Sequence, residues 1–357
     1  MYTLVQRKKA ERDFSSAGSF FLLKAEKFLA PLLERLDAQL DKRLVRTFFD
    51  LFVSVLRFRN RPFGLILSEL GAYVLSPQQS CAGTKRISNL LRSPKWTHAV
   101  VETFLIEQAQ KRMDELKSLK QRALLLWDDS VLEKPESWYS EGLCSVASSK
   151  AKRLTRIKTG FYNPPNARIC VPGFEWTSVV LTTLQSAPSV VCMRWWTTRG
   201  KYISDRKSQF LQLFKHLSRS LTHRVIHVLD RWYADASILT RIISDNQYFI
   251  VRWVKTYNLK DIHGLTQKTQ LHARSHKDQL VKIIWDAPRK RYRRVAISYQ
   301  VVFLPKHPDH ALTLVVCRDS KHKQEPMYLL TNCPVITKTQ AWNILFSYMR
   351  RWTIEQA

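Results

Sequence analysis

The sequence is poor in acidic residues and contains no long hydrophobic run. Its 357 residues include 58 lysines and arginines against 29 aspartates and glutamates, which gives a formal net charge of +29. No uninterrupted apolar stretch approaches the ~18 residues that a membrane span needs, and the N-terminus lacks the apolar core of a secretory signal. These absences argue against a secreted or membrane-embedded protein, so we expect no membrane partner and a cytoplasmic location.

The six cysteines form no recognisable pattern. They are scattered along the chain, with no C-x-x-C pair and no histidine partner at zinc-finger spacing. We therefore expect reduced cysteines that fill core positions. Internal repeats and low-complexity tracts are also absent, which leaves one large domain or two or three ordinary ones.

The content of apolar, aromatic and basic residues predicts a folded protein that binds a polyanion. Apolar residues make up 45% of the chain and aromatic residues 11%, far above the level of disordered proteins. An excess of cations this large favours nucleic acid as the partner. An anionic membrane surface or an inert basic surface are the alternatives.

The first third of the chain is predicted to be helical. Leucines recur every three or four residues from Leu29 to Leu44, as one buried stripe of an amphipathic helix requires. A second helix is expected from Phe48 to Phe58. The short basic segment Thr84 to Arg92, which contains Lys85 and Arg86, could place its cations on DNA phosphates, or it could be a solvated helix face.

After residue 120, strands and helices alternate, and two strands end in aspartate. The apolar run Leu124 to Trp127 precedes Asp128 and Asp129, and the run Val225 to Leu229 precedes Asp230. Carboxylates at strand ends can hold hard divalent cations, and two such ions can promote phosphodiester cleavage. An aspartate after a strand is also a common cap or turn residue, so the pattern alone is weak.

Three ordered motifs resemble bacterial insertion-sequence DDE transposases of the group marked by Tyr, Arg, Glu and Lys at fixed spacing. They are Trp127 to Ser130, Leu229 to Arg231 and Tyr348 to Glu355. In the last motif, Tyr348, Arg351 and Glu355 stand at the family's offsets. Tyr248 to Arg252 and Met327 to Asn332 also resemble the family, and a weaker similarity lies in the N-terminal region, from Thr84 to Trp96.

The resemblance implies an α/β fold with a ribonuclease-H-like mixed sheet flanked by helices. It also implies an N-terminal all-α region, residues 1–118, that binds DNA ends. Residues 119–357 would be the catalytic domain, with a β-rich insertion at about 255–332.

The family's catalytic residues transfer to this chain as two aspartates and a glutamate. Only one of Asp128 and Asp129 can meet the metals, because neighbouring side chains on a strand point to opposite faces. In the family the aspartate directly precedes Ser or Thr, which favours Asp129 and leaves Asp128 as the alternative. Asp129, Asp230 and Glu355 would then hold two Mg²⁺ ions, with Mn²⁺ able to substitute.

The DNA contacts expected from resemblance and charge involve nine residues. They are Tyr348, Arg351, Arg231, Arg252, Lys85, Arg86, Lys150, Lys152 and Arg153. For Arg351 and Glu355, an ordinary ion pair within one helix is the competing interpretation.

The resulting hypothesis is a nucleoid-associated DNA transposase that acts as a homodimer. It would bind terminal inverted repeats, cut double-stranded DNA with metal ions and join the freed end to target DNA. The sequence stops two residues after Glu355, before the family's lysine. A second hypothesis is therefore a truncated, inactive copy that binds DNA or inhibits transposition, and a third is a ribonuclease-H-like nuclease without strand transfer.

Overall fold

The computed structural model describes residues 16–58, 66–134, 142–148, 169–201, 203–221, 223–275, 280–286, 290–319 and 325–356. These residues divide into two compact units, 1–104 and 105–357. The predicted boundary at residue 118 is the end of a helix, α5 (His98–Ser118), that spans the observed division.

The first unit is entirely helical in its described part. Its elements are α1 (Ser16–Gln39), α2 (Lys42–Phe58), α3 (Leu67–Val74), the 3-10 helix η3 (Pro77–Gln79), α4 (Ser80–Arg92) and the start of α5. The predicted leucine stripe is divided between two helices, because α1 ends shortly before Asp41 and α2 begins directly after it. The carboxylate of Asp41 accepts the backbone N–H of Arg43. Four of the five leucines are buried, and Leu44, in α2, is half-buried.

Two glycines let α3 and α4 lie in direct contact. A Cβ added to Gly83 of α4 would lie 2.0 Å from the carbonyl oxygen of Gly71 in α3. The basic helix predicted over Thr84 to Arg92 is the larger part of α4.

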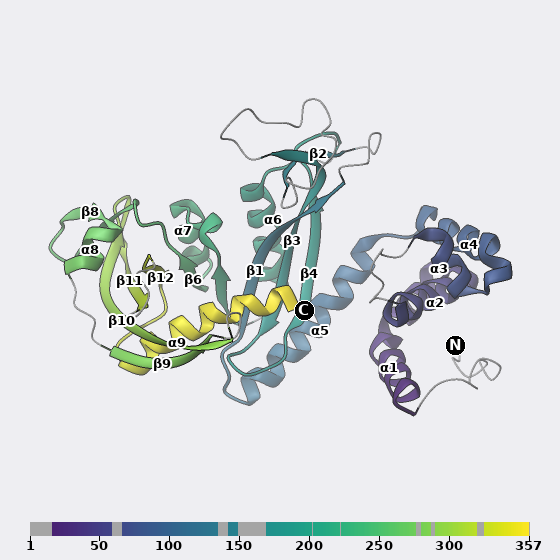
Figure 1. Cartoon of the computed structure of the whole chain (residues 1–357), viewed down its shortest axis with the longest axis horizontal. Coiled ribbons are helices and arrows are strands. Elements are labelled where there is room, and N and C mark those ends of the chain that lie inside the picture. Colours follow the sequence, from purple (N-terminus) through teal and green to yellow (C-terminus); the bar gives the residue numbers. More distant parts are fainter. Residues whose placement is uncertain are drawn as a thin grey trace. The chain divides into compact units, whose positions relative to one another are not determined.

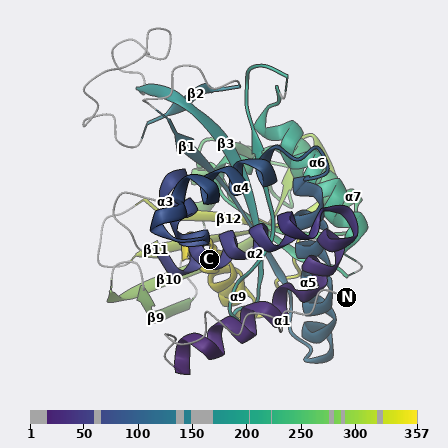
Figure 2. The ribbon, with the colours of Figure 1, turned by 90° about the vertical axis from the view of Figure 1, so that its right-hand side faces the viewer.

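The second unit is a mixed α/β structure built on one twelve-stranded sheet. Its first strands are β1 (Leu124–Glu133), β2 (Cys144–Ala147), β3 (Cys170–Thr182), β4 (Ser189–Trp196), β5 (Ile226–Leu229) and β6 (Tyr248–Arg252). β1 pairs antiparallel with β3 and parallel with β5, β5 pairs parallel with β6, and β4 pairs antiparallel with β3. The order β4-β3-β1-β5-β6 makes this a mixed sheet, as the sequence predicts. β1 and β3 run side by side in both views (Figure 1 and Figure 2).

Helices cover both faces of this sheet. On one face, Leu125 and Trp127 of β1 share a core with α5, α6 (Arg206–Ser220) and α7 (Ala236–Ser244). On the other face, Leu124 and Leu126 pack with α9 (Lys338–Met349), the yellow helix of Figure 1. The 3-10 helix η5 (Arg231–Tyr233) follows β5, and η6 (Arg350–Gln356) follows α9.

The stretch predicted as a β-rich insertion continues the same sheet. It contains β7 (Asn258–Lys260), β8 (Thr266–Lys268), α8 (Thr269–Ser275), β9 (Leu280–Asp286), β10 (Arg291–Leu304), β11 (His307–Asp319) and β12 (Met327–Thr331). β12 returns to pair antiparallel with β6, which joins these strands to the core.

None of the helices within the described ranges is long and apolar enough to cross a membrane. The six cysteines all lie in these ranges and carry thiols rather than disulfides. Five are buried, as predicted, and Cys81 is exposed.

Candidate functional site

The two adjacent aspartates of β1 point to opposite faces of the sheet. Leu126 belongs to the core under α9, whereas Trp127 belongs to the core under α6. Because side chains alternate along a strand, Asp128 follows Leu126 toward α9 and Asp129 follows Trp127 toward α6. The contacts of the two carboxylates agree with this geometry.

Asp129 lies in a closed polar site at the start of α6. Its side chain is 5% exposed, its Oδ1 accepts the hydroxyl of Thr177 at 2.6 Å, and its Oδ2 lies 2.9 Å from Arg206 Nε. The Oδ2 and Nε atoms are close but not aligned as a hydrogen bond. Burial raises the pKa of Asp129, against the opposing effects of Thr177, Tyr233 and Arg206.

Arg206 connects this carboxylate to neighbouring groups. One of its terminal nitrogens lies 4.0 Å from Glu175 Oε2, and burial raises the pKa of the Glu175 carboxyl as well. Its guanidinium also lies 4.8 Å from the ring centroid of Trp232, which is 61% exposed. The predicted ligand Asp129 is therefore held by an arginine on the face opposite α9.

Asp128 lies beside the C-terminal helices. Its Oδ1 accepts a hydrogen bond from Arg351 at 2.5 Å, and the two side chains are 21% and 14% exposed. The Asp128 carboxylate is therefore more exposed than that of Asp129, which is 5% exposed. Sequence reasoning predicted Arg351 as a DNA contact but did not predict this pair.

Asp230 follows β5 at the position that corresponds to Asp128 at the end of the parallel strand β1, and its charge also acts to raise the pKa of Asp129. Leu126 is paired with Val228, so the two aspartates follow at equivalent positions of adjacent strands. The carboxylate of Asp230 accepts the backbone N–H of Trp232 at 2.8 Å. Burial raises its pKa, while Arg351, Arg206 and Arg252 act in the opposite direction.

Arg351 contacts Asp128 and acts on the charge of Asp230. Burial disfavours the charge of Arg351, but Tyr348, Asp128 and Asp230 outweigh burial and raise its pKa. Tyr348 is only 5% exposed, and burial raises the pKa of its phenol. The predicted DNA contact Tyr348 is thus a buried neighbour of Arg351.

The other predicted site residues are distributed between the two units. Arg231 is exposed directly after Asp230, and Arg252 is half-buried at the end of β6. Lys85 and Arg86 are exposed on α4 of the first unit. Glu355 belongs to η6, but its side chain lies outside the described residues, as do Lys150, Lys152 and Arg153.

The carboxylates fit a divalent cation in chemistry, although the described part of the chain does not complete a site. No group of three His, Cys, Asp or Glu among those residues is arranged to hold a metal. Asp128 and Asp230 supply oxygen ligands of the kind that Mg²⁺ prefers, and both already act on one cation, Arg351. A third oxygen ligand is needed, and η6 contains the predicted one, Glu355.

Sequence reasoning missed three further polar residues. Glu175 and Arg206 surround Asp129, and Arg350 donates to the turn between β3 and β4. The only signal for Glu175 was an acid inside an otherwise apolar strand. Arg206 and Arg350 had none, because their partners lie far away in sequence.

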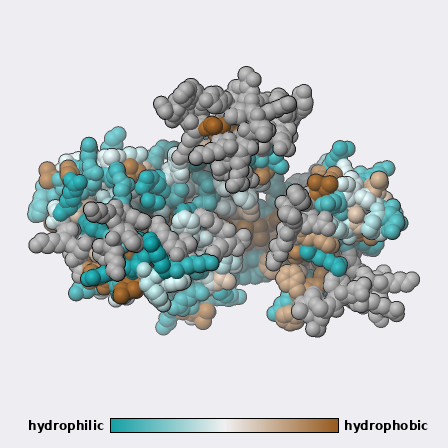
Figure 3. Space-filling model, viewed as in Figure 1, coloured by the Kyte–Doolittle hydropathy of each residue, from teal (hydrophilic) through white to brown (hydrophobic). Residues whose placement is uncertain are grey.

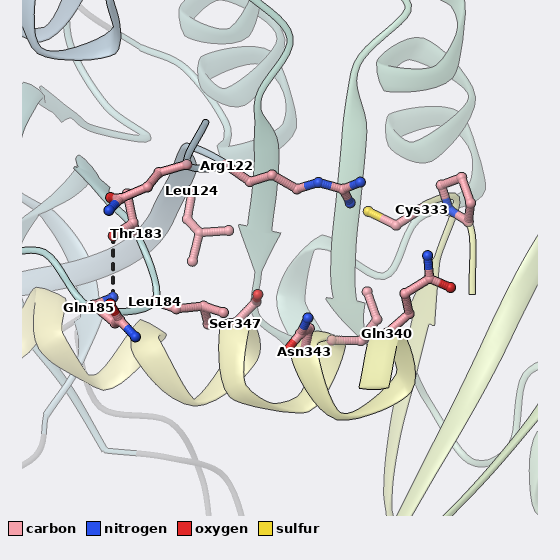
Figure 4. Close-up of a pocket in the computed structure, with 12 residues that line it drawn as sticks. Arg122, Leu124, Thr183, Leu184, Gln185, Cys333, Gln340, Asn343 and Ser347 are labelled. Carbon is pink, nitrogen blue, oxygen red and sulfur yellow. Dashed lines mark hydrogen bonds between the residues drawn. The ribbon is translucent and has the colours of Figure 1, made fainter. Parts of the chain in front are cut away.

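A separate cavity of about 390 Å³ lies under α9 at the other end of β1. Figure 4 shows Gln340, Asn343 and Ser347 lining it from α9, and Thr183, Leu184 and Gln185 from the β3–β4 turn. Arg122 and Leu124 approach from the start of β1. The cavity has no acidic lining residue and shares none with the carboxylate site.

No family model matches the chain, and no curated protein matches it. Among solved structures, it is similar to a piggyBac transposase in a synaptic complex with hairpin DNA. The identity is 11% and the TM-score 0.44, over 89% of this chain and 58% of that one. The chain therefore spans little more than half the length of that protein.

Proposed function

We propose that this protein is a metal-dependent DNA transposase that binds terminal inverted repeats, cuts at them and joins the freed end to target DNA. The observation that carries the proposal is the hydrogen bond from Arg351 to Asp128, which brings η6, the short helix that contains Glu355, to the strand end where Asp128 and Asp230 occupy corresponding positions. The basic composition supports a polyanionic substrate. The motif resemblance supports DNA and transposition.

In this proposal, Asp128, Asp230 and Glu355 hold two Mg²⁺ ions, or Mn²⁺ in their place. Two such metal ions would activate an attacking hydroxyl and stabilise the leaving oxygen of a phosphodiester. The alternation of β1 favours Asp128 over Asp129, because only Asp128 faces α9 and its partner Arg351. Asp129, which contacts Arg206 and Thr177, would then position the end of β1 from the face of the sheet that α6 covers.

The arginines around the carboxylates would grip the DNA backbone. Arg351 has the planar fork that binds two phosphate oxygens at once, and a metal ion held by Asp128 would leave this arginine available to the phosphate. Arg231, exposed beside Asp230, and Arg252 would contact neighbouring phosphates. Tyr348 would hold Arg351 in place from its buried position.

The remaining parts of the proposal concern partners. Lys85 and Arg86 on α4 would contact the element ends, and Lys150, Lys152 and Arg153 would add phosphate contacts. A homodimer would hold two ends together. These assignments rest on charge and on the motif resemblance.

The test is a cleavage and joining assay with Mg²⁺ on a labelled duplex that carries the inverted repeat flanking the coding sequence. The neighbouring variants Asp128→Asn and Asp129→Asn form a matched pair, with Asp230→Asn beside them. We expect Asp128→Asn and Asp230→Asn to abolish cleavage, and Asp129→Asn to retain part of it.

Three outcomes would contradict the proposal in different ways. Binding without cleavage by the wild type would reject an active enzyme, and cleavage without joining would indicate a nuclease. Loss of cleavage in Asp129→Asn with full activity in Asp128→Asn would return the ligand role to Asp129.

A further inference from the structure

The cavity under α9 differs in character from the surface of the second unit. On the face shown in Figure 3, hydrophilic residues cover most of the described surface of that unit. The cavity, by contrast, has buried apolar residues in its lining, because Leu124 is 1% exposed and Ile344 is 5% exposed. Its volume of about 390 Å³ lies within the usual range of small-ligand sites. It is therefore large enough to enclose a small organic molecule.

One face of helix α9 supplies polar groups to this cavity. Gln340, Asn343 and Ser347 are spaced three and four residues apart, so they lie on the same side of the helix. The hydroxyl of Ser347 has no hydrogen-bond partner among the described residues, although the residue is only 5% exposed. Figure 4 shows its oxygen directed into the cavity. A buried hydroxyl without a partner marks a position where a ligand can complete the hydrogen bonding.

Amide side chains surround the same space from three sides. Gln340 uses its carbonyl oxygen in the cap of α9, where Oε1 accepts the backbone N–H groups of Ile336 and Thr337. Its amide nitrogen has no partner among the described residues and is available as a donor. Gln185 lines the cavity from the β3–β4 turn, and Gln121 lines it from the segment before β1. These two amides can both donate to a ligand and accept from it.

Arg122 is the one charged residue among the twelve described residues that line the cavity. Figure 4 shows its guanidinium extending from the start of β1 toward Cys333. Burial raises the pKa of the Cys333 thiol, and the charge of Arg122 acts in the opposite direction. Arg122 makes no ion pair within the described part of the chain. A lining with one arginine and no carboxylate favours a ligand that carries a phosphate or another oxyanion.

The cavity also lies where η6 is attached to the sheet. Arg350, three residues after Ser347, donates to the backbone oxygen of Thr183 at 3.0 Å, and Thr183 lines the cavity. Arg350 therefore joins the end of α9 to the β3–β4 turn, and a molecule in the cavity would contact the same two elements. A ligand that contacts both favours the conformation in which they are joined.

The combination of groups in the lining fits a nucleoside monophosphate. Arg122 has the planar fork that can bind two oxygens of its phosphate. The side-chain amides match donors and acceptors on the edge of a base, as asparagine and glutamine do with adenine. Leu124 and Ile344 offer apolar contacts to the sugar and the base. A simple carboxylic acid would leave most of the amides without partners, and a nucleic-acid strand is far larger than the cavity.

We propose that the cavity under α9 binds a free nucleoside monophosphate, with the phosphate on Arg122 and the base beside Gln185 and Asn343. The bound nucleotide strengthens the attachment of η6 to the β3–β4 turn. This site goes beyond the proposed function, because it shares no lining residue with the carboxylates and needs neither DNA nor a metal ion.

The test measures binding to the full chain by isothermal titration calorimetry, without divalent metal. The probes are the monophosphates of adenosine, guanosine, cytidine and thymidine, each compared with its uncharged nucleoside. Inorganic phosphate and a 5′-phosphorylated oligothymidylate complete the set. Arg122→Gln removes the cation of the cavity, and Asn343→Ala removes an amide. Arg219→Gln is the matched control, because it removes an equal charge from an exposed position of α6 outside the lining.

We expect one or more monophosphates to bind about tenfold more tightly than the nucleoside, which lacks the charge-assisted contact with Arg122. Arg122→Gln should weaken monophosphate binding by about tenfold and Asn343→Ala by about fivefold. Arg219→Gln should leave it unchanged. In the wild type, bound nucleotide should slow amide hydrogen exchange of residues 182–186 and 350–356, and Arg122→Gln should lose this protection at the same nucleotide concentration.

Several results would overturn the proposal. One is the absence of binding by all four monophosphates, and another is equal affinity for a monophosphate and its nucleoside or for inorganic phosphate. Equal losses in Arg122→Gln and Arg219→Gln would show attraction to the overall positive charge instead. Oligothymidylate binding with the same dependence on Arg122 would assign the cavity to strand ends. Unchanged exchange at residues 350–356 with nucleotide bound would reject the link to η6.

These outcomes are separable from those of the cleavage assay, because Arg122 and Asn343 lie outside the carboxylate site. Nucleotide binding that depends on Arg122 in a protein that cannot cut DNA would reject only the proposed enzyme. Cleavage that needs Asp128 in a protein that binds no monophosphate would reject only this cavity as a nucleotide site.

Discussion

At the scale of single residues, the direction of one side chain decides what a carboxylate can do. Asp128 and Asp129 have the same chemistry and adjacent positions, yet one meets Arg351 and the other Arg206. The first pair is partly open to solvent, while Asp129 is almost fully enclosed. A pleated strand imposes this difference, because consecutive side chains leave it in opposite directions.

His227 provides a second example of a residue defined by its surroundings. It lies on β5 with 1% exposure, and its Nδ1 accepts the indole N–H of Trp127 at 3.0 Å. Burial lowers its pKa from 6.5 to about 3, because a charged imidazole would lose its hydration. His227 is therefore neutral in the folded protein, with its proton on Nε2.

We predict that His227 makes the protein less stable in mild acid. Below pH 6.5 the unfolded chain takes up a proton that the folded chain refuses until pH about 3. The free energy of unfolding should fall by about 1.4 kcal/mol per pH unit across that window from this residue. Urea unfolding at a series of pH values measures the slope.

The control for this prediction is a variant that cannot titrate. His227→Asn keeps an acceptor for Trp127 and should flatten the slope between pH 3 and 6.5 by about one proton. His310→Asn, at an exposed histidine of β11, should leave the slope nearly unchanged. Equal slopes in the wild type and His227→Asn would show that another group is responsible.

At the scale of elements, two neighbouring arginines connect the short helix η6 to the sheet. Arg350 donates to Thr183 O and to Thr182 Oγ1 at 3.0 Å each, and to Ser186 O at 2.5 Å. All three acceptors belong to the β3–β4 turn. Arg351, the next residue, donates to Asp128 of β1. The two arginines therefore connect η6 to the neighbouring strands β1 and β3.

We predict that Arg350→Ala releases η6 from the sheet. Three hydrogen bonds from a half-buried guanidinium are lost, so the stability should fall by roughly 1–3 kcal/mol. Amide hydrogen exchange of residues 350–356 and 182–186 should become faster. Mass spectrometry of these two peptides provides the measurement.

The matched control is Arg241→Ala, which removes an exposed pair with Asp245 within α7. Such a pair contributes only a few tenths of a kcal/mol, so neither peptide should change. Unchanged exchange at residues 350–356 in Arg350→Ala would mean that the Arg351–Asp128 contact and packing hold η6 without Arg350.

At the scale of the whole molecule, charge is the dominant property. The surplus of 29 cations is shared by two units whose folds differ completely, one of helices and one built on a sheet. Such an excess is not needed for packing, and it opposes compaction through self-repulsion. A polyanionic partner would relieve that repulsion.

We predict that binding to duplex DNA of unrelated sequence weakens steeply with salt. If roughly six to ten phosphates are neutralised, the affinity should fall by about three to five powers of ten between roughly 50 and 200 mM salt. Fluorescence anisotropy at several salt concentrations gives the slope. Binding that does not respond to salt would contradict a charge-driven contact.

Two variants with equal loss of charge locate part of this contact. Lys85→Gln/Arg86→Gln on α4 should reduce the salt slope by about two. Lys215→Gln/Arg219→Gln, at exposed positions of α6, should reduce it less. Equal reductions would show that α4 has no special role.

Much of the fold could be predicted from local patterns. The β1 and β5 strands, the alternation of strands and helices after residue 120 and the helical first third were all expected from hydrophobic patterns. The end of the first helix before Asp41 was not expected, because it depends on a local hydrogen bond of the Asp41 side chain. The continuation of the sheet through β12 could not be predicted either, since the β6 pairing joins residues some eighty positions apart in sequence.

The candidate site was predictable in its residue types but not in its geometry. Asp128, Asp230 and Arg351 stand out in the sequence because they follow apolar strands or a recognisable helix motif. Their mutual contacts depend on the parallel register of β1 with β5 and on the path of α9. The sequence left Asp128 and Asp129 as alternatives and favoured the second, whereas the contact with Arg351 favours the first.

By itself, the sequence determined the excess of positive charge, the alternation of strands and helices, and the acids at strand ends, because these are properties of composition and short-range order. Only the tertiary structure decided which acid meets Arg351, which arginine holds η6, and which aromatic residues face solvent. Trp253 and Trp285 show the reason: both stand in basic, strand-forming segments, yet one is 3% and the other 50% exposed. Burial depends on what the rest of the chain packs against each position.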